Sequence, residues 1–147
     1  MSRADPPHRP SHRGGYPAAV ALLAAAAWAM LVPYLGSAWE LTVGVPARVE
    51  VVDHVLPGAL AALAGAFCLA RRGRDPAIAP DPSVVLASAL AVLAGFWITA
   101  THVPVLFVAA DGGLSWAAAV LHASAGPPVL AASLALLLGE QRRRPGR

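Results

Sequence analysis

The chain has 147 residues, of which 57% are hydrophobic and 13% are charged, and its mean hydropathy of +0.60 excludes an ordinary soluble domain of this size. The net charge of +3 comes from eleven basic residues, all of them arginine. The single cysteine, Cys68, excludes an internal disulfide and a C-x-x-C redox pair. We therefore expect an integral membrane protein.

The chain begins with an arm, residues 1–15, that is rich in Pro, Gly, Arg and His and has no apolar periodicity. This composition predicts a disordered cytoplasmic arm in which His8 and His12 are solvated. The first apolar window follows at residues 16–38. It is longer than the apolar region of a signal peptide, so we expect it to be retained as a membrane span. Cleavage after Gly36–Ala38 is the alternative.

A helix needs roughly 20 apolar residues to cross the hydrocarbon core. Three further windows meet this requirement, at residues 51–70, 83–109 and 114–139. The third span contains Pro104, where it could kink, and the fourth contains the pair Pro127–Pro128, which should kink or interrupt its helix. The sequence thus predicts an all-α protein with a four-helix transmembrane bundle over residues 16–139 and a basic tail at residues 140–147.

Arginine placement predicts the orientation of the spans, because basic residues flanking a span stay in the cytoplasm. Ten arginines flank one side of the predicted bundle and only Arg48 lies on the other. We expect a plasma-membrane protein with both termini cytoplasmic. Topology and anionic lipid account for the positive charge, so it does not indicate a nucleic-acid partner.

Small residues recur every three or four positions in two of the predicted spans. Such spacing places them on one helix face, where they allow helices to approach closely in lipid. The residues are Gly58, Ala61, Ala62 and Gly65 in the second span and Ala87, Ala91, Gly95 and Thr99 in the third.

Three histidines, His54, His102 and His122, lie in the half of the bundle that we expect to face outward. His122 is roughly 12 Å below the outer edge at about 1.5 Å per residue, and the other two lie near the outer ends of their spans. Each shares a helix face with small residues, which predicts that it points into the bundle, as polar groups in a membrane generally must. We expect the three side chains to converge within about 10 Å.

Several roles fit such a cluster. Three imidazoles can bind a transition metal, with Asp53 and Asp111 as supporting carboxylates and Glu50 also nearby. His102 and His122 could instead be the axial ligands of one haem. The histidines could also handle protons or sense pH. Finally, they could serve only in packing, for example through a hydrogen bond from His102 to Thr99.

No catalytic motif accompanies the histidines, and the absence of a charged residue deep in a span argues against a drug/proton antiporter. The sequence therefore favours a non-catalytic accessory or interaction subunit that has a membrane protein or a second copy as its partner. A metal- or haem-binding redox or transport protein is the alternative, and a proton-handling or pH-sensing protein is the second alternative.

Overall fold

The computed structural model describes residues 15–38, 44, 46–71 and 81–142. The predictions made for residues 1–14, including His8 and His12, concern a part of the chain outside this set. The same is true of the arginines at 72–74 and at 143–147.

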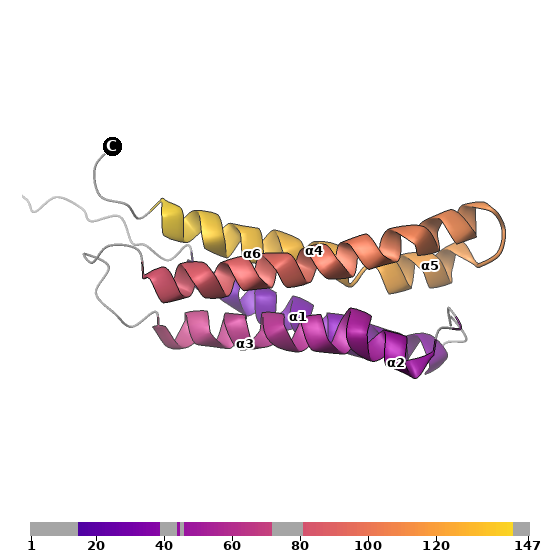
Figure 1. The fold of residues 1–147 in the computed structure, drawn as a ribbon, viewed down its shortest axis with the longest axis horizontal. Helices are drawn as coiled ribbons and strands as arrows, with labels where there is room; N and C mark the ends of the chain where they lie inside the picture. Colours follow the sequence, from indigo (N-terminus) through magenta and orange to yellow (C-terminus); the bar gives the residue numbers. More distant parts are fainter. Residues whose placement is uncertain (1–14, 39–43, 45, 72–80, 143–147) are drawn as a thin grey trace, which may run out of the picture.

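The described chain is helical, and it contains no strand. Its elements are α1 (Gly15–Ala38), α2 (Ala47–Glu50), the π-helical turn η1 (Val51–Val55), α3 (Leu56–Arg71), α4 (Pro82–Ala110), α5 (Trp116–Ala123) and α6 (Gly126–Gln141). Four helical stretches are long and apolar enough to cross a membrane: Tyr16–Gly36, Ala47–Arg71, Pro82–Ala110 and Trp116–Gln141. The prediction of four apolar helices is confirmed, and they pack side by side as an elongated bundle (Figure 1).

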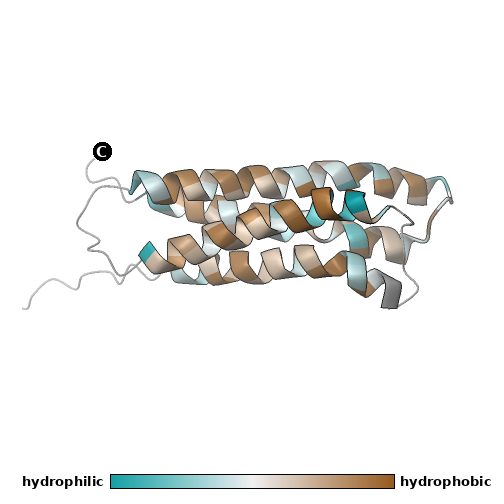
Figure 2. Ribbon diagram, turned by 60° about the horizontal axis from the view of Figure 1, so that its bottom comes forward, coloured by the Kyte–Doolittle hydropathy of each residue, from teal (hydrophilic) through white to brown (hydrophobic). Residues whose placement is uncertain are grey.

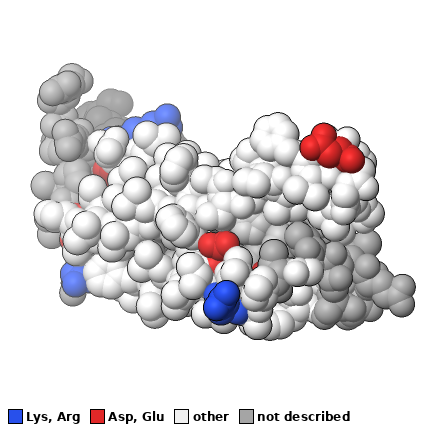
Figure 3. Space-filling model, turned by 45° about the vertical axis from the view of Figure 1, so that its right-hand side comes forward, with Lys and Arg blue, Asp and Glu red and all other residues white. Residues whose placement is uncertain are grey.

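The inside of the bundle is built largely from alanine, with a few larger side chains such as Leu22, Val32 and Ile98 fully buried among them. Large apolar side chains face outward instead: Leu63 is 70% exposed and Phe107 is 67% exposed. Hydrophobic residues run along the helices (Figure 2), and charged residues are few on the face shown in Figure 3. An apolar exterior around a small-residue interior is the arrangement that lipid favours.

Neighbouring helices in the bundle run antiparallel. Along α3, Gly58 lies against Met30 of α1, whereas Gly65, two turns later, lies against Leu23. On the other side of the bundle, α4 and α6 run in opposite directions, because Gly95 lies against Leu130 and Thr99 lies against Gly126. The start of α1 and the end of α6 therefore lie at the same end of the molecule.

We name the two ends of the bundle by residues that mark them. At the Asp81 end, Arg71 of α3 pairs with Asp81 at 3.5 Å, and the Asp81 backbone N–H donates to Glu140 of α6 at 3.2 Å. The Asp111 end holds α2, η1 and the turn between α4 and α5, in which Gly112 has a φ of 77°.

Both predicted sets of small residues lie at helix contacts. Gly58 and Gly65 pack on α1, and Gly95 packs on the backbone of α6, where a Cβ atom would approach Leu130 N to 2.6 Å. Without side chains at these positions, the helix backbones come close together, as small-residue faces allow in membranes.

The fourth span is interrupted at Ser124–Ala125, between α5 and α6. Pro127 and Pro128 follow the break, and each lacks a backbone N–H that a continuous helix would use. The Ser124 hydroxyl donates to Leu121 O at 2.6 Å and accepts from the indole of Trp28 at 2.9 Å, so polar groups at the break have partners. The predicted interruption at the proline pair is confirmed. In contrast, α4 continues through Pro104 to Ala110.

Candidate metal centre

His54, His102 and His122 meet inside the bundle, in the half nearer the Asp111 end. They come from η1, α4 and α5, and their exposed fractions are 0%, 3% and 8%. Their ring centroids are separated by 4.4 Å, 4.6 Å and 4.7 Å. The expected convergence of the three side chains is confirmed, and so is their inward direction.

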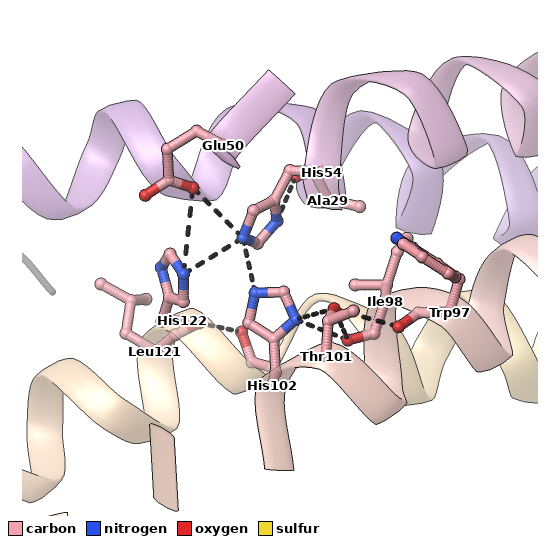
Figure 4. Close-up of polar contacts among 10 residues, drawn as sticks. Ala29, Glu50, His54, Trp97, Ile98, Thr101, His102, Leu121 and His122 are labelled. Atoms are coloured by element: carbon pink, nitrogen blue, oxygen red, sulfur yellow. Dashed lines mark hydrogen bonds and ion pairs between the residues drawn. The ribbon is translucent and has the colours of Figure 1, made fainter. Parts of the chain in front are cut away.

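The rings turn their nitrogen atoms toward a common point (Figure 4). His54 Nε2 lies 2.7 Å from His102 Nε2 and 3.3 Å from His122 Nε2. One ring nitrogen from each histidine lies within 4.8 Å of the other two, which is close enough for all three to bind one metal ion. The three ligating atoms come from three separate helical elements.

Main-chain carbonyls determine which nitrogen carries the proton in two of the rings. His54 Nδ1 donates to Ala29 O of α1 at 3.1 Å, and His102 Nδ1 donates to Ile98 O at 2.5 Å. Since a carbonyl oxygen can only accept, each Nδ1 must be protonated, and a neutral imidazole then has a lone pair at Nε2. These two lone pairs face each other across the 2.7 Å contact.

Glu50 is the carboxylate that reaches the cluster. Its Oε2 atom lies 3.4 Å from His54 Nε2 and 3.9 Å from His122 Nε2. Asp53 is half-buried within η1, and Asp111 is exposed at the C-cap of α4. Within the described residues, the group of side chains close enough to hold an ion consists of the three histidines, without Asp53 or Asp111.

Two of the histidines lie at irregular features of their helices, and the third lies near a proline inside a continuous helix. His54 is inside the π-helical turn, His102 is two residues before Pro104, and His122 is one residue before the last residue of α5, at the interruption of the fourth span. Turns of π-helix and broken membrane helices often occur where side chains or backbone serve a binding site. The second and fourth spans depart from regular helix geometry near the level where the imidazoles meet, whereas α4 stays continuous.

The contact between His54 and His102 suits a cation shared by the two rings. Two lone pairs at 2.7 Å repel each other unless a proton or a metal ion lies between them. A proton bridges only two atoms, whereas a metal ion can bind all three imidazoles and a carboxylate at once. The arrangement therefore suits a metal ion better than a shared proton.

The arrangement does not suit a haem held by His102 and His122. Axial ligands lie on opposite faces of the macrocycle, but these two rings are 4.7 Å apart between centroids and are tilted by 45°. His54 lies 4.4 Å from one of them and 4.6 Å from the other. The three rings in contact leave no space for a porphyrin between two of them.

Of two further contributors to the cluster, Ala29 has no signal in the sequence, and Glu50, which the sequence suggests as a nearby carboxylate, has a weak one. Ala29 acts through its main-chain carbonyl, which every residue possesses. Glu50 precedes the predicted span and resembles any charged residue at a helix end; only its spacing of four residues from His54 indicates a shared helix face.

The chain matches no protein-family model, no curated protein and no solved structure.

Proposed function

We propose that this chain is a membrane protein that binds one divalent transition-metal ion through His54, His102 and His122. The observation that carries the proposal is the pair of Nε2 atoms that face each other at 2.7 Å while both Nδ1 atoms donate to main-chain carbonyls. Metal-binding histidines typically use their second nitrogen in this way, which fixes the tautomer and orients the ring.

The energetic cost of the cluster also favours a ligand. Each buried polar group left without a partner costs about 1–3 kcal/mol, and the lone pairs of this cluster face one another within an apolar bundle. Ionisable residues in membrane spans are rare and generally mark a functional site. A bound cation would convert this repulsion into coordination.

We further propose that the Asp111 end, with the metal centre, faces outward across the plasma membrane and that both termini are cytoplasmic. The ends of α1 and α6 that lead to the termini lie together at the Asp81 end, which also holds Arg71 and Arg142. Basic residues favour the cytoplasmic side, so this end would be inside.

The expected role as a non-catalytic accessory subunit, with a membrane protein or a second copy as its partner, stays a prediction. Metal binding is compatible with it, because a bound ion can stabilise a surface or be passed on without a reaction in the protein that holds it.

Metal analysis of the full chain tests the proposal. The protein would be purified in mild detergent with an affinity tag other than polyhistidine, incubated with Zn²⁺, Cu²⁺ or Fe²⁺, and freed of excess ion. We expect about one ion per chain, retained against washing, and its loss in His102→Ala and in His122→Ala. The matched control is the double variant His8→Ala/His12→Ala, which removes two histidines of the N-terminal segment that precedes the first predicted span and should leave the stoichiometry unchanged.

Two results would contradict the proposal. One is a wild-type chain that retains none of these ions. The other is bound metal that persists in His102→Ala and disappears in the control variant, because the ion would then be held by the arm.

A further inference from the structure

Glu50 has the one side-chain oxygen that is buried without a hydrogen bond among the described residues. Its side chain is 17% exposed, but the Oε2 atom itself is fully enclosed. This oxygen points toward the histidine cluster (Figure 4). Glu50 ends α2, and His54 follows four residues later in the π-helical turn, so the two side chains share one face of the second span.

A buried carboxylate oxygen without a donor is costly unless a cation compensates it. The two imidazoles nearest to Glu50 are those of His54 and His122. Because His54 Nδ1 donates to Ala29 O, a neutral His54 presents a lone pair to the carboxylate rather than a proton. A metal ion among the imidazoles would meet this negative charge, and the carboxylate would halve the net charge of a divalent ion in a medium of low dielectric.

The distances also fit a fourth ligand. A tetrahedral ion with metal–donor distances of about 2.0 Å keeps its donors about 3.3 Å apart. His54 Nε2 is 3.3 Å from His122 Nε2 and 3.4 Å from Glu50 Oε2. On metal binding, the distance between His54 Nε2 and His102 Nε2 would lengthen from 2.7 Å. The distance between Glu50 Oε2 and His122 Nε2 would shorten from 3.9 Å.

We infer that Glu50 is the fourth ligand of the centre, which is a closed tetrahedral site of three imidazoles and one carboxylate for a divalent ion of the zinc class. This inference rests on the proposed metal-binding function and specifies its donor set. Four protein donors leave no coordination position for water. The ion is therefore held, and the site does not generate a metal-bound hydroxide as a hydrolytic zinc site does.

Cobalt is a suitable probe, because Co²⁺ replaces Zn²⁺ in tetrahedral sites and absorbs visible light strongly only when it is four-coordinate without a centre of symmetry. The full chain would be titrated with Co²⁺, and Zn²⁺ affinity would be measured by competition. We expect Glu50→Gln to weaken Zn²⁺ binding by about 100-fold or more and to change the cobalt spectrum. The matched control is Glu140→Gln, the same change from carboxylate to amide at the Asp81 end of the bundle, which should leave both unchanged.

A second variant gives a positive signal. Glu50→Cys places a thiol at the proposed fourth position, and a thiolate bound to Co²⁺ adds a charge-transfer band in the near ultraviolet. Cys68, which lies toward the Asp81 end, is present in both proteins and cancels in the comparison. Thermal unfolding without metal checks that each variant folds.

The outcomes separate the two proposals. A wild-type chain that binds neither ion ends the metal-binding function and this inference with it. A wild-type chain that binds both ions, together with a folded Glu50→Gln variant of unchanged affinity and spectrum, overturns only the role of Glu50. A new thiolate band in Glu50→Cys supports that role, and its absence in a folded, cobalt-loaded variant contradicts it.

Discussion

Gly126 brings the start of α6 into direct contact with α4. A Cβ atom at this position would lie 2.4 Å from Thr99 Oγ1 and 2.5 Å from Thr99 N, so a backbone would have to move. Thr99 Oγ1 is itself engaged, because it donates to Gly95 O at 2.7 Å. The two helices can approach this closely only because residue 126 has no side chain.

We expect Gly126→Ala to destabilise the protein by about 1–3 kcal/mol, the usual cost of overpacking. The measurement is unfolding in detergent, followed by helical circular dichroism. Gly139→Ala is the matched control, since a Cβ atom there would meet nothing within 4 Å. Equal stability of Gly126→Ala and wild type would show that the contact between α4 and α6 relaxes without cost.

At the same scale, the sequence predicts which residues form the cluster but not how the rings are oriented. The positions of His54, His102 and His122 along their helices place them in the same half of the bundle, and flanking small residues place them inside. The carbonyls of Ala29 and Ile98 that hold the rings could not be predicted, because main-chain groups carry no signature of residue type. The part played by Glu50 depends on side-chain direction as well as on spacing.

Among the elements, α4 begins at a side-chain cap that also joins three helices. Asp81 accepts from Ser83 N at 2.9 Å, pairs with Arg71 of α3, and donates its own backbone N–H to Glu140 of α6. An N-terminal cap satisfies backbone donors that the helix leaves without partners.

We expect Asp81→Ala to cost about 1–2 kcal/mol of stability, because the cap is lost. Asp81→Asn should cost less, since asparagine also caps and the pair with Arg71 is about one-third exposed and contributes little. Chemical unfolding of both variants in one detergent compares the two losses. Equal losses in the two variants would mean that charge, rather than capping, dominates at this helix start.

The helices themselves were more predictable than their irregular turns. Apolar windows of sufficient length predict four helices, and the missing donors of Pro127 and Pro128 predict the interruption before α6. The π-helical turn has no such signal, because the residues of Val51–Val55 are compatible with an ordinary α-helix. The turn packs against α1 and α4, and local sequence does not encode such contacts.

In the whole molecule, the antiparallel packing of neighbouring helices places the start of α1 and the end of α6 on one side. The orientation of the bundle across the membrane can be tested directly. In a Cys68→Ser background, cysteine would be introduced at Asp111 or at Gln141, both of which are exposed. We expect a membrane-impermeant maleimide added to intact cells to label residue 111 and not residue 141.

Permeabilised cells provide the control for this experiment, because both positions should then react. Labelling of residue 141 alone in intact cells would reverse the proposed orientation and place the histidine cluster in the cytoplasmic half. Reaction of both positions in intact cells would contradict a bundle that spans the membrane with the start of α1 and the end of α6 on the cytoplasmic side.

Among the hydrogen bonds of the described residues, the first helix reaches the histidine cluster through the main-chain carbonyl of Ala29. Substitution of Ala29 therefore cannot remove the acceptor itself, but Ala29 is fully buried and a larger side chain at that position would overpack the bundle. Gly58, four residues after His54, faces α1, where a Cβ atom would meet Met30 Cγ at 2.6 Å and Ala26 O at 3.3 Å. A larger residue at 58 would force Met30 or the α1 backbone to shift and would weaken the hydrogen bond that His54 Nδ1 donates to Ala29 O. The hydrogen bond of the His54 imidazole is therefore sensitive to substitution at Gly58, a residue outside the cluster. Gly58 sets the spacing between α1 and α3 on which this hydrogen bond depends.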